Sequence, residues 1–292
     1  MDILRKGVSG KCRVRFTSAD VTVTAKALEA RHLSGPVAGK LIGEGLTAVS
    51  MLSSDAARKD EAVSIHMTVN GPIQGMLVEA TVAGDLRGYT HKKIVEGLDS
   101  AATIDTDAAI GSTGNIRIIK TIPGSILGQA EMRVDPPRMT YVVARYFNHS
   151  MQIPAAVEIA VRSDPAGLIS ARGIIAERMP DSDQQAFIRI LEAFNKGLVR
   201  TQLEKTSLLP DFGAVFGLDD IVEKESRKLQ FRCRCSTERA FASFSALSPE
   251  DLREIAEAGK PQHVTCHLCG QDYSFTPEEV GALLEKSKGT GQ

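Results

Sequence analysis

The sequence predicts an α+β protein built from three parts: a mainly antiparallel sheet domain with helices, a helical linker, and a small C-terminal module. Strand-like segments before residue 180 are joined by turns and not by regular helices, which argues against a doubly wound α/β fold. A charged, helix-periodic stretch follows Pro180, and four of the five cysteines lie in two tight pairs near the C-terminus. We therefore expect domains at 1–180, 181–228 and 229–292.

The first strand is expected at residues 11–25, KCRVRFTSADVTVTA, where apolar and polar side chains alternate. In a strand, Cys12, Val14 and Phe16 would share one face. Cys12 is therefore interpreted as a small buried hydrophobic side chain and not as a functional thiol.

A helix is predicted to begin at Ser34-Gly35-Pro36, because proline is favoured in the first helical turn. Gly39 and Gly43 lie four residues apart on it. We interpret this spacing as a place where another element packs closely and not as a ligand site.

Further strands are predicted on both sides of turn signals at Asn70-Gly71-Pro72 and Ala83-Gly84-Asp85, within residues 63–89. A hairpin is expected from 115–120 and 128–134, a helix end at 141–147, and two strands around Asp164-Pro165-Ala166-Gly167. His66 falls inside a predicted strand without a cysteine or carboxylate at ligand spacing. It is interpreted as a core or surface histidine.

The linker begins with a predicted helix capped by Ser182 or Asp183, with polar helical or irregular segments following down to Lys228. Its apolar stripe is narrow, and about a third of the residues from Glu177 to Lys228 are charged. Isolated helices of this length are marginal in water, so the linker is expected to need a docking surface. The stripe consists of Phe187, Ile190, Leu191, Phe194 and Leu198, with Gly197 inside the pattern.

The C-terminal module has the pattern Cys-x-Cys, thirty residues, then Cys-x-x-Cys: Cys233, Cys235, Cys266 and Cys269. Two close pairs of thiolates suit tetrahedral Zn²⁺, and an all-cysteine site is favoured over one that uses His263 or His267. The module has few apolar residues, and domains of this size usually need a metal or disulfides. It is thus predicted to be a zinc-binding module.

Two secondary-structure expectations accompany this site. In a strand, Cys233 and Cys235 would point to one side, and a helix from Ser248 to Glu257 with a short hairpin after His263 would complete the module.

Three arginines lie close to the first pair of cysteines. Arg232, Arg234 and Arg239 would offset part of the negative charge of a four-thiolate zinc site and favour ionised thiols. Spacing alone leaves an inert zinc ribbon and a redox switch as equal alternatives.

Composition narrows the function classes. The chain has 292 residues, a formal net charge of -1, no tryptophan and 5% aromatic residues, so neither charge nor stacking points to nucleic acid. A zinc ribbon that binds nucleic acid stays the main alternative, although acidic residues outnumber basic ones from Phe231 to Glu278. We find no signal peptide, membrane span, phosphate loop, Gly-x-Ser-x-Gly elbow or His-Glu-x-x-His motif, so we expect a soluble, cytoplasmic protein that is not an enzyme.

Residues Arg232–Arg239 and Thr265–Phe275 together resemble the signature of the heat-shock protein 33 family, a group of redox-regulated chaperones. The segments GPVAGKLIGEGLTAVSML, NGPIQGMLVEATVAGDLRGY and YFNHSMQIPAAVEIAV are similar to that family too, so the resemblance covers nearly the whole chain. Met151 and the segment SARGIIAERMP depart from the residues that family members often carry there.

The resemblance implies a reduced, zinc-bound, inactive state whose ligands are Cys233, Cys235, Cys266 and Cys269. It implies that oxidation forms the local disulfides Cys233–Cys235 and Cys266–Cys269, releases zinc and unfolds the linker. The oxidised protein would be a dimer that holds unfolding client proteins without ATP, with no nucleic-acid or membrane partner. Because the two disulfides close very short loops, they would not replace the zinc as a link between distant segments.

Overall fold

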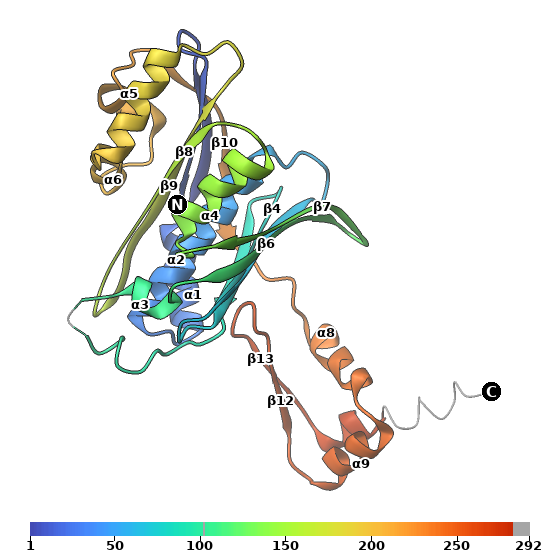
Figure 1. Cartoon of the computed structure of the whole chain (residues 1–292). Coiled ribbons are helices and arrows are strands. Elements are labelled where there is room, and N and C mark those ends of the chain that lie inside the picture. The colour runs from blue at the N-terminus through green and yellow to red at the C-terminus, as the bar shows by residue number, and fades with distance from the viewer. Residues whose placement is uncertain (102, 283–292) are drawn as a thin grey trace. The chain divides into compact units, whose positions relative to one another are not determined.

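The structure of the chain, a computed structural model, describes residues 1–101 and 103–282 and separates into two compact units, Met1–Arg232 and Cys233–Gln292 (Figure 1). It is a mixed α+β fold with antiparallel sheets, as predicted. The predicted linker belongs to the first unit. The expected division at 180 and 228 into functional parts stays a prediction, and the last ten residues of the expected module lie outside the described residues.

The first unit contains a five-stranded antiparallel sheet. In spatial order its strands are β10 (Ile221–Lys228), β1 (Ile3–Ser9), β2 (Val14–Asp20), β9 (Gly167–Arg178) and β8 (Ala155–Asp164). The turn predicted between the last two strands is present, since Asp164 pairs with Gly167. Side chains alternate between the two faces, and both faces are buried: Phe16 and Ile174 on one, Ala19 and Ile175 on the other.

The second sheet of this unit has six strands. Their spatial order is β11 (Gln230–Phe231), β5 (Asp85–Thr90), β4 (Gly75–Thr81), β3 (Ala62–Val69), β6 (Gly114–Ile122) and β7 (Ser125–Val134). The pairs from β5 to β7 are antiparallel, and β11 runs parallel to its neighbour β5. The predicted turns join β3 to β4 and β4 to β5, and β6 and β7 form the predicted hairpin, whereas β3 and β6 pair without being consecutive in the chain. His66 lies in β3, as expected.

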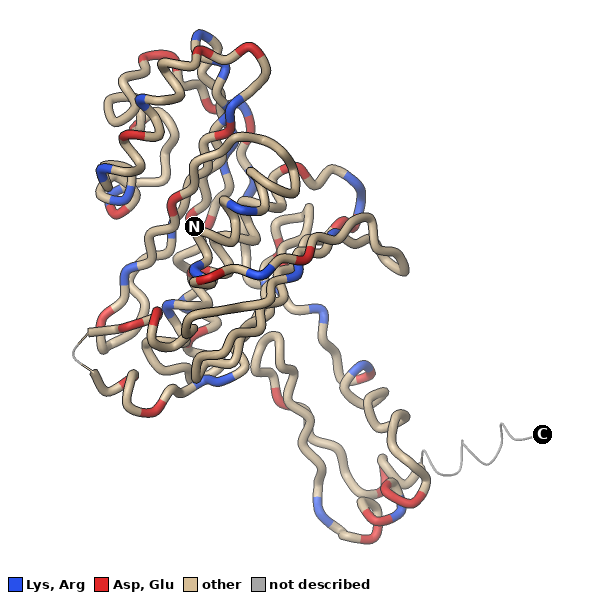
Figure 2. Tube along the Cα trace, in the orientation of Figure 1, with Lys and Arg blue, Asp and Glu red and all other residues tan. Residues whose placement is uncertain are grey.

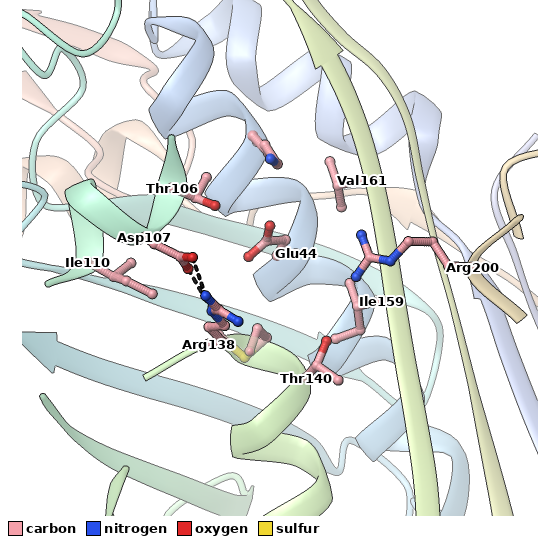
Figure 3. Close-up of a pocket in the computed structure, with 11 residues that line it drawn as sticks. Glu44, Thr106, Asp107, Ile110, Arg138, Thr140, Ile159, Val161 and Arg200 are labelled. Carbon is pink, nitrogen blue, oxygen red and sulfur yellow. Dashed lines mark hydrogen bonds and ion pairs between the residues drawn. The ribbon is translucent and has the colours of Figure 1, made fainter. Parts of the chain in front are cut away.

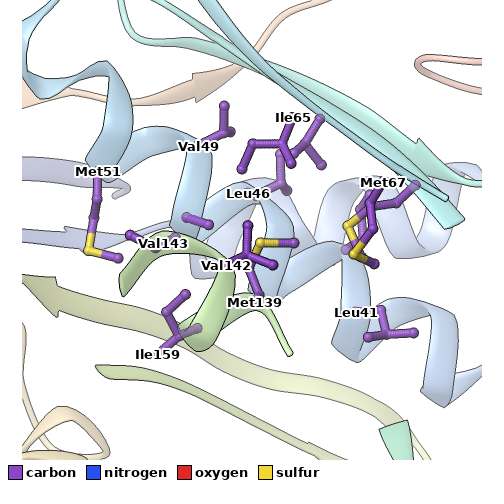
Figure 4. Packing of buried hydrophobic residues seen from close by; sticks show 14 of the residues in the cluster. Leu41, Leu46, Val49, Met51, Ile65, Met67, Met139, Val142, Val143 and Ile159 are labelled. Atoms are coloured by element: carbon purple, nitrogen blue, oxygen red, sulfur yellow. The ribbon is translucent and has the colours of Figure 1, made fainter. Parts of the chain in front are cut away.

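Helix α2 (Pro36–Leu52) contacts strands of both sheets and forms the centre of the main apolar core. Figure 4 shows its side chains packed against Ile65 and Met67 of β3 and Ile159 of β8. The remaining helical segments here are α1 (Thr22–Arg31), the 3-10 turn η1 (Ser53–Asp55), α3 (Thr106–Ile110), α4 (Met139–Arg145) and the π-helix η2 (Tyr146–Ser150). The predicted helix start at Pro36 is confirmed.

The two glycines of α2 are places of close approach, as the sequence predicts. A Cβ added at Gly43 would lie 2.8 Å from Cδ1 of Leu168, and one at Gly39 would collide with the carboxylate of Glu29. That carboxylate accepts hydrogen bonds from the Leu168 amide at 3.0 and 3.1 Å. The small residues therefore let α1, α2 and the β8–β9 turn pack together.

The linker packs on the face of the five-stranded sheet that is opposite to α2. It contains α5 (Gln184–Asn195), α6 (Leu198–Leu203), the 3-10 turn η3 (Leu209–Phe212) and α7 (Gly213–Phe216). We call its apolar interface with the sheet the linker cluster. The buried members of this cluster are Cys12, Val14, Phe16, Ala160, Ile174, Ala176 and Ile221 from the sheet and its β1–β2 turn, and Ala186, Phe187, Ile190, Ala193, Val199, Leu203, Leu209, Phe212 and Phe216 from the helical part of the linker.

An aromatic stack lies in the linker cluster. The ring of Phe216 is 5.3 Å from that of Phe16, which belongs to the sheet, and 5.9 Å from those of Phe194 and Phe212. Cys12 is buried in the same cluster, as predicted. The narrow apolar stripe of the linker is thus buried against the five-stranded sheet. This is the docking surface that the marginal linker helices were expected to need.

Three details of the sequence interpretation are wrong. The strand predicted over 11–25 ends at Asp20 and α1 follows, because the Asp2 carboxylate accepts from the amides of Val23 and Thr24 and satisfies the first helical turn. Residues 221–228 form strand β10 instead of polar helix, because they pair with the edge of β1. The predicted apolar stripe is also broken: Gly197 adopts a left-handed conformation (φ 71°) between α5 and α6, and Leu198 is exposed.

The second unit is a small module. It contains α8 (Thr237–Ala242), the 3-10 turn η4 (Ser243–Ala246), α9 (Pro249–Glu257), β12 (Gln262–Thr265), β13 (Asp272–Phe275) and helical residues at 277–282. Ser248 and Asp251 form a capping box at α9, which confirms the predicted helix start. The apolar core of the module, which we call the module cluster, has as buried members Ala240, Phe244, Leu252, Phe275 and Val280.

Candidate metal centre

Cys233 and Cys235 lie in a segment without regular secondary structure, between β11 and α8. The predicted strand is absent because the pairing of β11 with β5 ends with the bond from the Arg232 amide to the Leu86 carbonyl, at 3.1 Å, before the first cysteine. Arg239 holds the segment instead: its Nη1 donates to the carbonyl of Arg234 at 2.6 Å, between the two cysteines. Ser236 caps α8 by accepting from the Arg239 amide, so the helix that follows fixes both the arginine and the cysteine segment.

Cys266 and Cys269 are positioned by the β12–β13 hairpin. The Cys266 amide donates to the carbonyl of Gln271 at 2.8 Å, and the amides of Cys269 and Gly270 donate to the carbonyl of Cys266. Gly270 has φ 70°, which a residue with a side chain rarely adopts. The turn predicted here therefore exists, and it brings both sulfur atoms to one side of the hairpin end.

The four sulfur atoms converge, and all lie within 4.8 Å of one another. Sγ of Cys233 is 3.8 Å from that of Cys266, and Sγ of Cys235 is 3.4 Å from that of Cys269. A tetrahedral zinc site with Zn–S bonds of about 2.3 Å has sulfurs about 3.8 Å apart. The four thiols can therefore hold one metal ion with little movement. His263 and His267 are not part of this group, nor is Cys12, which lies in the first unit.

The electrostatics of the four thiols are uneven. Burial raises the pKa of Cys266 and of Cys269, and Cys269 is the most buried of the four, at 1% exposed. For Cys235, burial acts in the same direction, but hydrogen bonds from Tyr273 and the other thiols outweigh it and lower its pKa. A metal ion bound here would have to displace the protons of Cys266 and Cys269. Its positive charge would then stabilise the two buried thiolates, which burial alone makes unfavourable.

Sequence reasoning found these four residues but not the side chains that hold them. Arg239 was expected to act through its charge, whereas in the structure it fixes the backbone at Arg234. Arg232 forms a long ion pair with Asp85 at 4.0 Å. Tyr273 was expected only as a strand residue, and its hydroxyl contacts Cys235. Its place directly after the Cys-x-x-Cys turn, on the strand paired with β12, was the available signal.

Two other observations bear on the class of protein. Within the described ranges, the structure contains no helix with the length and apolar character of a membrane span. From residue 233 to 282, aspartate and glutamate outnumber lysine and arginine eight to four. Figure 2 shows most of the acidic positions of the module around α9. Nothing in this distribution favours the nucleic-acid alternative.

Comparison with known proteins agrees with the resemblance. The family model described as Hsp33 protein matches residues 2–276. A 33 kDa chaperonin of Symbiobacterium thermophilum is 30% identical over 288 residues, covering 96% of each chain. A 33 kDa chaperonin of Geobacillus is 25% identical and covers 97% of each chain. The solved structure of a 33 kDa chaperonin from Thermotoga maritima superposes with a TM-score of 0.88 at 22% identity, over 98% of this chain and 99% of that one, which shows the shared fold.

Proposed function

Because the chain belongs to the Hsp33 family, whose curated relatives are named 33 kDa chaperonins, we propose that it is a redox-regulated holdase chaperone that needs no ATP. In the reducing cytoplasm, Cys233, Cys235, Cys266 and Cys269 hold Zn²⁺ and the protein is inactive. Oxidation releases the metal, undocks the linker and exposes apolar surface for unfolding client proteins. The oxidised form acts as a homodimer.

The observation that carries this proposal is the convergence of four thiols on a module with a very small core. Five buried apolar side chains form the module cluster. A core of this size contributes little stability by itself, whereas a structural zinc contributes about 10–16 kcal/mol of apparent folding free energy at neutral pH. The metal is therefore the dominant stabilising link, and removing its ligands by oxidation would unfold the module.

The chemistry of activation is the oxidation of four thiolates. Forming the disulfides Cys233–Cys235 and Cys266–Cys269 removes four electrons in total, and two molecules of peroxide accept them and are reduced to water. Each disulfide forms inside one segment. Neither one joins the Cys233 segment to the β12–β13 hairpin, so the module loses its cross-link when the metal leaves.

The reduced geometry makes disulfide mapping a sharp test. The sulfur pairs Cys233–Cys266 and Cys235–Cys269, at 3.8 and 3.4 Å, join the two segments. Disulfides between those partners would close loops of more than thirty residues and contribute roughly 3 to 4 kcal/mol, so they would keep the module folded. Local pairing is therefore required for a switch, and cross-segment pairing would produce an oxidised but folded module.

The linker cluster supports the second half of the proposal. If the helical part of the linker undocked, its nine buried side chains and the seven on the sheet side would become exposed to solvent. Continuous apolar surface of this kind is what unfolding proteins bind. Residues 229–232 join the linker directly to the first cysteine, and we propose that unfolding of the module is transmitted along the chain through them.

The test is to measure zinc release, disulfide connectivity and client protection on the same samples. Reduced protein should hold one zinc per chain and fail to suppress aggregation of a chemically unfolded client. Peroxide-treated protein should have lost the zinc, contain the two local disulfides and suppress aggregation at near-stoichiometric ratios without ATP. Equal protection by both forms, or disulfides that join the two segments in a folded module, would contradict the proposal.

A further inference from the structure

A polar cavity of about 250 Å³ lies in the first unit where α2, α3, α4, β8 and the linker helix α6 meet (Figure 3). This volume is below the roughly 300–1,000 Å³ of pockets for drug-sized ligands, and it suits a small ligand. Its charged lining residues are Lys40 and Glu44 from α2, Asp107 from α3, Arg138 next to α4, and Arg200 from α6.

The cations of this cavity are only partly neutralised by the protein. Arg138 donates from Nε and Nη2 to Asp107, and Arg200 donates from Nη2 to Glu158 at 2.6 Å. Arg138 also bonds to Tyr141. Since each guanidinium group has five N–H donors, both Arg138 and Arg200 keep donors that these partners do not use. Within the described residues, the Lys40 ammonium group makes no hydrogen bond or ion pair. The cavity therefore has unused donors from three positive side chains.

Glu44 points into the middle of this group of cations (Figure 3). Its carboxyl group makes no hydrogen bond in the part of the chain that the structure describes. Burial raises the pKa of Glu44 to about 7, Asp107 acts in the same direction, and Lys40, Arg200 and Arg138 oppose them. Near neutral pH this carboxyl group therefore changes between an acceptor with negative charge and a neutral hydrogen-bond donor.

We propose that the cavity is a binding site for one small divalent oxyanion, of the size of sulfate or phosphate, which binds together with a proton on Glu44. With Glu44 protonated, three cations face the cavity and only Asp107 and Glu158 offset them, so an anion is favoured. With Glu44 ionised, the charges of these groups balance and the carboxylate repels the ligand. The hydroxyl groups of Thr106 and Thr140, which also line the cavity, supply further donors.

The site includes one side chain from the linker. Arg200 lies on α6, whereas the other four charged groups that line the cavity belong to or adjoin α2, α3 and α4. An oxyanion bound to Arg200 and Lys40 at once would tie α6 to the rest of the first unit. The bound anion should thus slow the local opening of α6.

The experiment is calorimetric titration of the full-length, reduced, zinc-loaded chain with sulfate at constant ionic strength, at pH 6 and pH 8. Sulfate is the probe because its own charge does not change in this range. We expect saturable binding of one sulfate per chain that is about tenfold weaker at pH 8, since the protonated fraction of a group with a pKa of about 7 falls from about 0.9 to about 0.1. Heats measured in buffers of different ionisation enthalpy should show proton uptake at pH 8.

Three variants define the site. Glu44→Gln imitates the protonated form and should bind sulfate at pH 8 about as tightly as the wild type does at pH 6, with no proton uptake. Lys40→Met should weaken binding about tenfold at pH 6, the usual effect of losing a charge-assisted hydrogen bond. Lys26→Met removes an exposed lysine of α1 outside the cavity and should change nothing. Glu44→Gln is expected to bind sulfate more tightly than the wild type at pH 8. A variant that failed to fold would bind sulfate less tightly, so misfolding cannot produce the expected result.

Hydrogen exchange supplies the readout for the linker. Saturating sulfate should slow exchange of the α6 amides in the wild type, and should not do so in Arg200→Gln. No saturable sulfate binding, or binding that is equally strong in Lys40→Met and equally pH-dependent in Glu44→Gln, would overturn the proposal. None of these measurements involves an oxidant or a client protein, so their outcome is independent of the proposed chaperone switch.

Discussion

The linker cluster and the module cluster show two different ways to hold a marginal segment. The helical part of the linker contributes nine buried apolar side chains to an interface to which the sheet and its β1–β2 turn supply seven more, and an aromatic stack centred on Phe216 lies inside it. The module cluster has five buried side chains in all. Packing alone can account for the docked linker, whereas under the proposed function the module depends on the metal that joins its four thiols. The two regions should therefore fail under different perturbations.

Loss of a metal ligand should have the largest effect and should be confined to the module. We expect Cys269→Ser, at the most buried of the four thiols, to abolish tight zinc binding and unfold residues 233–282. The cost is on the order of 10 kcal/mol of apparent folding free energy. Zinc content and hydrogen exchange measure both effects, and strands β1 to β9 should stay protected.

Cys12→Ala is the matched control for this prediction, because Cys12 is also a buried thiol but lies in the linker cluster. It should keep one zinc per chain. If Cys269→Ser also kept its zinc and its protected module, the module would not depend on the four-thiol centre, and the contrast between the two regions would be wrong.

Damage to the aromatic stack should have the next largest effect and should be confined to the linker. Phe216→Ala removes a ring that contacts Phe16, Phe194 and Phe212 and should cost about 3 to 5 kcal/mol. Amides of residues 184–216 should exchange faster, and Cys12 should react faster with a thiol reagent, because the linker covers it. Zinc affinity should not change.

Leu198→Ala serves as the comparison for Phe216→Ala, because Leu198 is a large apolar residue of the linker that is 48% exposed. It should leave the rate of amide exchange and the rate of Cys12 labelling close to those of the wild type.

Under the proposed function, reduced Phe216→Ala should already protect clients while it still holds zinc. A variant that undocks the linker and yet gives no protection would separate linker exposure from client binding.

Burial of a carboxyl group should make the stability of the first unit depend on pH. The pKa of Glu44 is raised from 4.5 to about 7, so the folded chain holds this proton to a higher pH than the unfolded chain. The stability that protonated Glu44 contributes is present below about pH 4.5 and is lost as the pH rises through 7. In urea unfolding at pH 8, in buffer without divalent anions, Glu44→Gln should be more stable than wild type by about 1 to 3 kcal/mol.

At pH 4.5 the same two proteins should differ by far less, because Glu44 is then protonated in the folded wild type and about half protonated in the unfolded chain. A difference that is independent of pH would mean that the substitution acts through packing and not through ionisation. Zinc affinity should be the same for both proteins at pH 8, since Glu44 belongs to the first unit.

The sequence was informative where a pattern is local and much less so where a partner is distant. Alternation and turn residues predicted β3 to β9 because each strand pairs with the next or nearly the next one along the chain. Helix α1 was missed because the carboxylate that satisfies its first turn comes from Asp2, about twenty residues earlier. Strand β10 was missed because its exposed, charged residues resemble a polar helix, and only the edge of β1 makes it a strand.

The candidate metal centre illustrates the same limit. Two close pairs of cysteines in a small module predicted which thiols would meet, since residue type and spacing were enough. How they meet was not predictable, because Cys233 and Cys235 are held by a hydrogen bond from Arg239 to the Arg234 carbonyl and not by a strand. The cavity around Glu44 had no sequence signal at all, since its charged groups come from four segments between residues 40 and 200.

The smallest predicted effect compares helix caps of equal strength in the two regions. Ser248 accepts from the Asp251 amide at 3.1 Å in the module, and Asp183 accepts from the Gln185 and Ala186 amides in the linker. Replacing either with alanine should cost about 1 kcal/mol. If folding and metal binding of the module are coupled, as we propose, Ser248→Ala should weaken apparent zinc affinity about fivefold in a chelator competition.

Asp183→Ala should leave zinc affinity unchanged and instead speed exchange in α5 by a similar factor, because the linker is held by packing on the sheet. The pair of variants thus separates two explanations of the module's fragility. If both caps altered zinc affinity equally, the linker and the module would fold as one cooperative unit, and oxidation would have to unfold them together. If neither did, the module would already be folded without metal, and its small core would be sufficient.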